Sequence, residues 1–391
     1  MPTTGAPTAV PTAGYAQIGQ DIDGSTAGDQ GGGFVAISAD GLTIGTGSNA
    51  ADVGGVDTGQ VRVFTYDTST WIQKGQSLNG VFDGEKAGTS VEISSDGNTV
   101  IYGGSGSGAR ARVYDWDAMN LMWVQRGITL TGSAVCISDD ASIIAIGNPL
   151  NAVGGGNAGS IEVYEWDGMA WQVRGAPIYG LTGQKLGNTI ACSGNASIVA
   201  AGAPAADGSA GRASVYQWDG MDYVLLGSEI TAAAAGDQQG LTSMSLSDSG
   251  LTIVLGASFN DANGVDAGLT RVFDYTGGSW VQRGANILGD KAGDRLGYST
   301  CVTDDGNIIA VGMALFDIVA GAVNIGATRM YQWNGALWDP YYQDLLGEAA
   351  GDASGISVAI SPDASHVVVG AFLNDGNGAS SGHTRVYQLF T

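Results

Sequence analysis

Histidine, cysteine and basic side chains are scarce in this sequence. Its 391 residues include two His, three Cys and 15 Lys or Arg, against 38 Asp or Glu. Imidazoles and thiols are too few for most metal or nucleophile chemistry, and no HExxH, CxxC or phosphate-binding motif is present. The formal net charge of −23 opposes binding to nucleic-acid phosphates and to anionic membranes, so we expect neither partner.

Charged residues and long apolar runs are also few. Charged side chains make up 14% of the chain, against roughly 25% in an ordinary globular protein. Hydrophobic residues make up 44%, which argues against a disordered polyanion. No apolar run approaches the roughly 20 residues of a membrane helix, so we expect no membrane insertion. Residues 1–14 are uncharged and rich in Thr, Pro, Ala and Gly, which is typical of a linker or leader rather than a secretory signal.

Glycine is abundant instead, with 65 residues. It recurs in a motif in which an aromatic residue is followed four positions later by Gly, and consecutive copies lie 48 to 58 residues apart. A repeat of this length indicates a repeat architecture. Six copies are complete and the seventh is degenerate after its Trp. The repeats begin near residues 15, 71, 123, 171, 223, 280 and 338.

Each repeat has the pattern of four short strands. From Trp280 these are WVQRGANIL, YSTCVT, NIIAVG and ATRMYQW, separated by polar loops or tight turns. Segments rich in β-branched and aromatic residues and bounded by such turns are typical of antiparallel strands. Seven four-stranded units predict an all-β, seven-bladed β-propeller over residues 15–391. A linear solenoid is the alternative, but it leaves two sheet edges unpaired.

The phase of the repeat predicts how the ring closes. The chain starts with a strand of the first type near residue 15 and ends with one of the fourth type at 384–390. We therefore expect the N-terminal strand to complete the last blade, whose other strands come from residues 357–390. This pairing hides both sheet edges.

The cysteines and most basic residues occupy repeat positions. Cys136 and Cys301 hold equivalent places in repeats three and six, and Cys192 lies one residue along in repeat four. We expect buried, unpaired thiols and no disulfide. Nine of the fifteen basic residues recur either before the motif Gly or inside the fourth strand, where we expect them to pair with Asp or with backbone oxygens. They are Arg62, Lys74, Arg112, Arg126, Arg174, Arg271, Arg283, Arg329 and Arg385.

The repeat resembles the FG-GAP repeats of integrin α-chain headpieces and of microbial and algal surface proteins. Leu296-Gly297-Tyr298-Ser299 is similar to the Phe-Gly-x-Ser start of that repeat, and Gly202-Ala203-Pro204 matches its Gly-Ala-Pro element. The resemblance implies a propeller that acts in binding or adhesion, outside the cell or at its surface. FG-GAP repeats often carry an Asp-x-Asp-x-Asp-Gly calcium loop. Here the corresponding turns, such as Ser95-Asp96-Gly97, offer too few oxygens for a six- to eight-coordinate site. We therefore expect no cofactor, and only weak calcium binding remains open to the other acidic loops.

Antiparallel strand order places the long, variable loops on one face of the ring and short turns on the other. Long loops on a rigid scaffold are the usual place for binding residues. Asp261, Asp266 and Asp375 lie in these loops and are candidates for binding a cation, a polyol or a basic partner. The alternative is a solvated acidic rim that keeps the protein soluble.

One repeat breaks the pattern on this face. The third repeat lacks the spacer between its first two strands, so we predict a notch there, between walls at 81–88 and 181–187. A concave, less acidic feature suits a neutral or anionic sugar. A neutral loop deletion is the alternative. The candidate binding residues at the notch are Asp83, Glu85, Lys86, Gly132, Ser133 and Lys185.

These observations favour a non-catalytic binding or adhesion module outside the cell, with a protein or glycan as its ligand. His366 and His383 lie in or beside predicted strands, and no Ser-His-Asp spacing is present. The alternatives are a structural, self-assembling subunit of a surface layer or filament and, less favoured, a hydrolase with an acidic pocket. The sequon Asn195-Ala196-Ser197 lies at an expected exposed turn and agrees with secretion.

Overall fold

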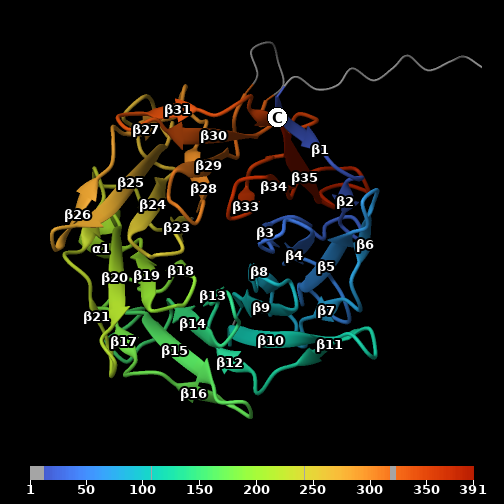
Figure 1. The fold of residues 1–391 in the computed structure, drawn as a ribbon, viewed down its shortest axis with the longest axis horizontal. Coiled ribbons are helices and arrows are strands. Elements are labelled where there is room, and N and C mark those ends of the chain that lie inside the picture. The colour runs from blue at the N-terminus through green and yellow to red at the C-terminus, as the bar shows by residue number, and fades with distance from the viewer. Residues whose placement is uncertain (1–12, 107, 242, 318–322) are drawn as a thin grey trace, which may run out of the picture.

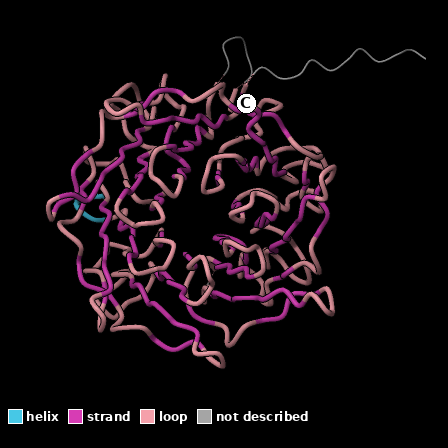
Figure 2. The backbone as a smooth tube through the Cα atoms, in the orientation of Figure 1, coloured by secondary structure: helices cyan, strands magenta, loops and turns pink. Residues whose placement is uncertain are grey.

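Seven antiparallel sheets surround a central axis in the computed structural model, which describes residues 13–106, 108–241, 243–317 and 323–391 (Figure 1). Each sheet has four strands side by side, and a short fifth strand pairs with the third of them, counted from the axis. One short helical turn, α1 (Ala206–Ser209), interrupts the strands and loops of the described ranges (Figure 2). The predicted all-β, seven-bladed β-propeller is confirmed. Residues 1–12 of the predicted leader lie outside the described ranges.

The strands fall into five roles, and each series runs in order from blade 1 to blade 7. The innermost strands are β3 (Phe34–Ile37), β8 (Ala87–Ile93), β13 (Ala134–Ile137), β18 (Ile190–Cys192), β23 (Met244–Leu246), β28 (Leu296–Val302) and β33 (Ser357–Ile360). The second strands are β4 (Thr43–Ser48), β9 (Thr99–Gly104), β14 (Ile143–Asn148), β19 (Ile198–Ala203), β24 (Thr252–Ala257), β29 (Ile308–Met313) and β34 (His366–Ala371). The third strands are β5 (Gln60–Tyr66), β10 (Arg110–Asp117), β15 (Ser160–Trp166), β20 (Arg212–Trp218), β25 (Leu269–Thr276), β30 (Ala327–Trp333) and β35 (His383–Phe390). The outer strands are β6 (Trp71–Gln73), β11 (Met122–Gln125), β16 (Trp171–Val173), β21 (Tyr223–Leu225), β26 (Ser279–Gln282), β31 (Trp338–Pro340) and β1 (Gly14–Gln17). The short strands are β7 (Leu78–Asn79), β12 (Leu130–Thr131), β17 (Ile178–Tyr179), β22 (Ile230–Thr231), β27 (Ile287–Leu288), β32 (Leu345–Leu346) and β2 (Ile22–Asp23).

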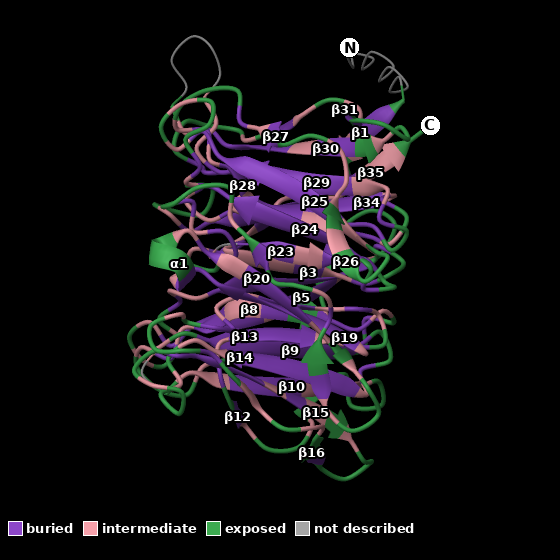
Figure 3. Ribbon diagram, turned by 90° about the vertical axis from the view of Figure 1, so that its left-hand side faces the viewer, coloured by how far each residue is buried: buried purple, intermediate pink, exposed green. Residues whose placement is uncertain are grey.

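The second strands form the most deeply buried layer, and each carries a Gly near its end. Edge-on, Figure 3 shows buried strands between two faces of exposed loops. A Cβ atom built at Gly256 would lie 2.0 Å from the carbonyl oxygen of Gly297, and one at Gly370 would lie 1.8 Å from that of Gly32. Side chains are excluded there because the backbone of the next blade passes directly over the strand. The equivalent glycines are Gly47, Gly103, Gly147, Gly202, Gly256, Gly312 and Gly370.

In five of the seven outer strands, the tryptophan of the aromatic-Gly motif bonds to a neighbouring blade. The indole Nε1 of Trp123 donates to the carbonyl oxygen of Lys74 at 2.6 Å, and that of Trp338 donates to Arg283 at 2.9 Å. The Gly that follows Lys74, Gly75, has φ +74°, and a Cβ there would lie 2.6 Å from the ring of Trp116. Only Gly combines this backbone conformation with room for the neighbouring aromatic rings.

The ring closes as predicted. β1 pairs antiparallel with β35 from Gly14↔Phe390 to Gln17↔Tyr387, and β2 pairs with the start of the same strand. The hydroxyl of Tyr15 also donates to the carbonyl oxygen of Ala364 at 2.6 Å, which ties β1 to a turn of blade 7. The N-terminal segment therefore supplies the outer edge of the last blade.

The expectation of unpaired thiols is wrong for two of the three cysteines. Cys136 of β13 and Cys192 of β18 form a disulfide, with Cα atoms 5.9 Å apart. Alternate residues of an inner strand face opposite neighbouring blades: Ala134 and Cys136 pack toward blade 4, whereas Val135 packs toward blade 2. Because blades 3 and 4 are adjacent, the one-residue offset of Cys192 turns its side chain back toward Cys136.

The third cysteine, Cys301 of β28, is a free thiol, and burial raises its pKa to about 11.

The repeated basic residues pair with carboxylates or backbone oxygens, as predicted, and several of these bonds join adjacent blades. Lys74 Nζ donates to the carbonyl oxygen of Gly97 at 2.8 Å, and Arg126 Nη1 donates to that of Ala141 at 2.6 Å. In the third strands, Arg271 Nη2 donates to the carbonyl oxygen of Thr231 in the preceding blade at 2.6 Å. These cations serve the ring and do not gather at one place.

Removing the closing strands should break the ring. A chain lacking residues 2–24 loses β1 and β2 and leaves the edge of β35 unpaired, so we expect a markedly lower melting temperature and aggregation. The control lacks residues 2–13 and keeps both strands. Equal melting temperatures for the two truncations would contradict the closed ring as the source of stability.

Reduction of the disulfide should destabilise the fold. The bond spans a sequence separation of 56 residues, so the variant Cys136→Ala/Cys192→Ala should lose about 2–4 kcal/mol of unfolding free energy. Denaturant titration with and without a reductant measures this loss. The control variant Cys301→Ala should be destabilised by reductant as much as the wild type. If reductant leaves the denaturant midpoint of the wild type unchanged, the disulfide does not stabilise the fold.

Candidate functional site: the mouth of the central channel

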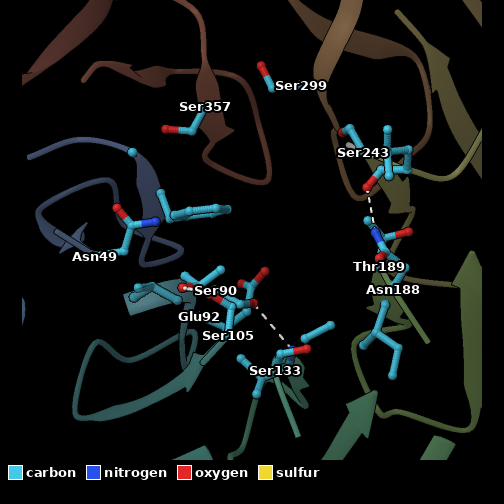
Figure 4. Close-up of a pocket in the computed structure, with 18 of the residues that line it drawn as sticks. Asn49, Ser90, Glu92, Ser105, Ser133, Asn188, Thr189, Ser243, Ser299 and Ser357 are labelled. Carbon is cyan, nitrogen blue, oxygen red and sulfur yellow. Dashed lines mark hydrogen bonds between the residues drawn. The ribbon is translucent and has the colours of Figure 1, made fainter. Parts of the chain in front are cut away.

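A cavity of about 620 Å³ opens at the channel mouth on the long-loop face. Its wall is built from the beginnings of the inner strands and from the loops beside them (Figure 4). Five of the seven blades place a hydroxyl residue at the same position of the inner strand, namely Ser90, Thr189, Ser243, Ser299 and Ser357. In blade 3 that position is Ala134, and the hydroxyl of Ser133 comes one residue earlier.

Most of these hydroxyls bond to the neighbouring blade. Ser357 Oγ donates to the carbonyl oxygen of Gly32 at 2.9 Å, Ser299 Oγ donates to that of Gly355 at 2.8 Å, and Thr189 Oγ1 donates to that of Gly240 at 2.8 Å. Each acceptor is a spacer glycine with positive φ. The hydroxyl ring therefore fixes the width of the mouth before any ligand arrives.

Other polar groups of the wall are free to meet a ligand. Within the described ranges, the side chains of Asn49, Asn148, Ser133 and Tyr298 make no hydrogen bond, and all four residues are half-buried. Half-buried rings of Phe34 and Phe372 line the same cavity. The mouth thus combines amide and hydroxyl groups with apolar surface, the usual mixture in small-ligand sites.

Glu92 is the one charged residue among the described residues that line the mouth. It belongs to β8 and is exposed to the channel. The surrounding ring of protein still removes much of its hydration, which raises the pKa of the carboxyl from 4.5 to about 7. Near neutral pH the group therefore both accepts and donates hydrogen bonds.

The rim of the mouth is shortened twice at the same place. Elsewhere each loop between the second and third strands of a blade pairs with the spacer that follows: Ala87 N donates to Thr58 O at 2.9 Å, and Leu186 N to Ala158 O at 3.0 Å. At blade 2 the loop is only 105–109 and the spacer only 132–133, joined by Gly132 N to Ala109 O at 3.0 Å. The spacer deletion was recognised from the sequence, whereas its partner loop was missed although its length is visible there.

No protein-family model matches this chain, and no curated protein matches it. The site must therefore be interpreted from its own chemistry. Among the described residues, no helix has the length and hydrophobicity needed to span a membrane.

The predicted site residues divide into two groups. Ser133 lines the cavity and Gly132 is next to it, whereas the other seven lie outside the lining. Glu85 is buried, forms an ion pair with Arg112, and accepts the backbone N–H of Val81 at 2.6 Å.

The remaining candidates mostly hold their own loops. Asp83 Oδ1 accepts the N–H of Val56 at 3.1 Å, Asp261 Oδ1 accepts that of Asp266 at 2.8 Å, and Asp375 Oδ1 accepts that of Ser380 at 2.8 Å. Asp266 pairs with Arg295 at 3.4 Å and Lys86 with Asp57 at 3.7 Å. Lys185 is exposed, and its backbone N–H donates to Asn157 O at 3.0 Å. The acidic residues among them thus mainly stabilise the conformations of the loops.

Glu92 is the functional candidate that the sequence analysis missed. Its strand reads SVEIS, and the equivalent position holds Ala36, Cys136 or Ala359 in other inner strands. A carboxylate among small residues is a signal that the sequence already contained. Asn49, Asn148 and Tyr298 carry no comparable signal, because polar residues are common in the loops and at strand ends.

The opposite face is closed by a chain of backbone hydrogen bonds. The first turn residue of each blade, from Ala39 to Asp304, donates its N–H to the corresponding carbonyl oxygen of the next blade, at 2.7 to 3.2 Å. The series ends at Pro362, which has no N–H. Burial and the nearby charges of Asp248 and Asp139 raise the pKa of Asp304, in this ring, to about 6. The sequon residue Asn195 is exposed in the same set of turns, as predicted.

Glu92 should make stability depend on pH. Its carboxyl stays protonated in the fold up to about pH 7, but it ionises near pH 4.5 in the unfolded chain, so stability falls as pH rises between these values. Glu92→Gln removes this loss. We expect the variant to match the wild type at pH 4 and to melt about 1–3 °C higher at pH 8. Thermal unfolding at several pH values measures the difference in melting temperature between the variant and the wild type. A difference that does not change with pH would contradict the raised pKa of Glu92.

Proposed function

We propose that this protein is a non-catalytic binding module that takes an uncharged or amino-bearing saccharide unit at the channel mouth. The observation that carries the proposal is the rigid cavity of about 620 Å³ with free amide and hydroxyl groups beside aromatic rings. Sugar hydroxyls require hydrogen-bond partners, and the C–H faces of the sugar ring pack on apolar surface. A cavity of this volume falls within the roughly 300–1,000 Å³ of small-ligand sites.

Charge favours a ligand without anionic groups. The chain carries a formal net charge of −23, so a carboxylated or sulfated glycan is repelled on approach. Glu92 accepts a hydrogen bond from a sugar hydroxyl or ammonium group when ionised, and its protonated form donates one to a sugar oxygen.

Binding is favoured over cleavage by the number of carboxylates. Glycoside hydrolysis ordinarily uses two carboxyl groups on either side of the bond that breaks. Among the described residues of the mouth, Glu92 is the only carboxylate.

We further propose that the protein acts outside the cell or at its surface, as an FG-GAP-like propeller. The Cys136–Cys192 disulfide supports this location, because such bonds persist mainly in oxidising compartments. The exposed sequon residue Asn195 adds to this support.

A structural subunit of a surface layer or filament is the second candidate. Met119, Met169 and Met221 occupy equivalent hairpins of three consecutive blades and are 90%, 88% and 76% exposed. An arc of apolar side chains in water favours contact with another molecule. Mass measurement in solution at rising concentration tests this candidate, which requires reversible growth beyond 39.5 kDa.

A glycan array followed by calorimetric titration tests the binding proposal. We expect neutral or amino glycans among the ligands, and Asn49→Ala and Asn148→Ala should each weaken binding about 5–10-fold through one lost hydrogen bond. Asn120→Ala, at an exposed hairpin away from the mouth, is the matched control. An array without such ligands, or affinities that no mouth variant changes, would overturn the proposal.

A further inference from the structure

Three potential metal ligands converge where the ring closes. Asp21 lies between β1 and β2, Glu348 lies in the spacer between β32 and β33, and His383 is the first residue of β35. His383 Nδ1 is 3.8 Å from Asp21 Oδ2 and 3.9 Å from Glu348 Oε2. One ligand atom of each residue lies within 4.8 Å of the other two.

His383 is buried without a partner. Its side chain is 1% exposed, and neither ring nitrogen makes a hydrogen bond to a residue that the structure describes. A neutral imidazole keeps a lone pair for a metal ion, and Nδ1 is the nitrogen that faces the two carboxylates.

Each carboxylate has one oxygen engaged and the other directed at the imidazole. Asp21 Oδ1 accepts a hydrogen bond from Gln17 Nε2 at 2.7 Å, which leaves Oδ2 toward His383. Glu348 Oε1 lies 3.5 Å from Arg385 Nη1, which leaves Oε2 toward His383. The engaged oxygens orient the carboxylates, and the free oxygens and Nδ1 face a common point.

The surrounding charge attracts a cation. The charges of Asp21, Asp23 and Asp352 act on Glu348 against that of Arg385, and Arg62 acts on Asp23. Arg385 also donates through Nη2 to the carbonyl oxygen of Leu346 at 2.8 Å, so its charge is shared. The cluster therefore has more negative charge than its own partners neutralise.

We propose that Asp21, Glu348 and His383 bind a divalent transition-metal ion of the zinc class, which fastens the N-terminal segment to the last blade. One nitrogen and two carboxylate oxygens suit Zn²⁺ and its neighbours, whereas Ca²⁺ prefers six to eight oxygens. Metal–ligand distances near 2.0–2.2 Å require the carboxylates to turn inward slightly. The side chains of Asp21 and Glu348 are 30% and 46% exposed, so they are free to turn and an ion reaches them from solvent.

The ion would connect three separate segments of the chain. It would link the loop before β2, the spacer that enters blade 7 and the third strand of that blade. Because a bound ion would add to the strand pairing and to side-chain hydrogen bonds such as Tyr15 to Ala364, it stabilises the closed form over the open one. This inference is independent of the saccharide proposal, since the cluster lies outside the channel mouth.

Zinc titration of the full chain tests the site in buffer containing millimolar Mg²⁺ and physiological salt, which suppress unspecific binding to the acidic surface. Calorimetry should show one saturable site, and Zn²⁺ should raise the melting temperature by several degrees while equimolar Ca²⁺ does not. Asp21→Asn and Glu348→Gln alter a half-buried and an exposed side chain without changing their size, and both variants should fold normally. Loss of a residue that only hydrogen-bonds a metal ligand lowers metal affinity ~10–100-fold, and each of these variants should lower Zn²⁺ affinity by more than that.

Asp52→Asn is the matched control, because it changes an exposed carboxylate of another loop on the same face whose Oδ1 likewise accepts one hydrogen bond. Cu²⁺ electron paramagnetic resonance supplies a second measurement. The nitrogen hyperfine pattern should be present in wild type and in His366→Gln and absent in His383→Gln. Absence of saturable Zn²⁺ binding, or binding that survives in Asp21→Asn/Glu348→Gln, would overturn the proposal even if His383→Gln fails to fold.

Discussion

The close approach of neighbouring blades at the second-strand glycines governs the rest of this structure. At each of these positions the next backbone passes so near that even a methyl group has no room, for example at Gly256 under the carbonyl of Gly297. The contact brings spacer carbonyls within reach of hydroxyls such as Ser299 and Ser357. Stability of the ring and the shape of the channel mouth thus arise from one geometric requirement.

The same requirement explains how an acidic chain can offer an almost uncharged site. Carboxylates are placed in the loops, where they accept backbone N–H groups or pair with arginines, as Glu85 does with Arg112. Hydroxyls and amides line the mouth, and of the lining residues that the structure describes, only Glu92 introduces a charge. Loop order and ligand chemistry are assigned to different residues, so either can vary without disturbing the other.

At the ring closure, one repeat by itself no longer supplies all the strands of a blade. Every other blade takes its four strands from one continuous stretch, whereas blade 7 joins β1 and β2 to strands more than 300 residues away in sequence. Hydrogen bonds such as Tyr15 to Ala364 and the cluster around His383 gather at this junction. Additional contacts are needed there because the pairing of the N-terminal strands with blade 7 closes the longest loop in the chain and has the largest entropy cost.

Periodicity by itself determined the fold, the number of blades, the closing strand and the structural role of the repeated arginines, because each repeat must solve the same packing problem. Part of the site was also visible in the sequence: Ser133 follows from the missing spacer, and Glu92 stands out in its strand. Only the tertiary structure decided that Cys136 meets Cys192, because the pairing depends on which blade each side chain faces. It alone also showed that Glu85 is buried, that Asn49 and Asn148 share one cavity, and that Asp21 reaches His383. Those contacts join residues of different repeats and depend on how the ring places the blades, which local sequence patterns do not specify.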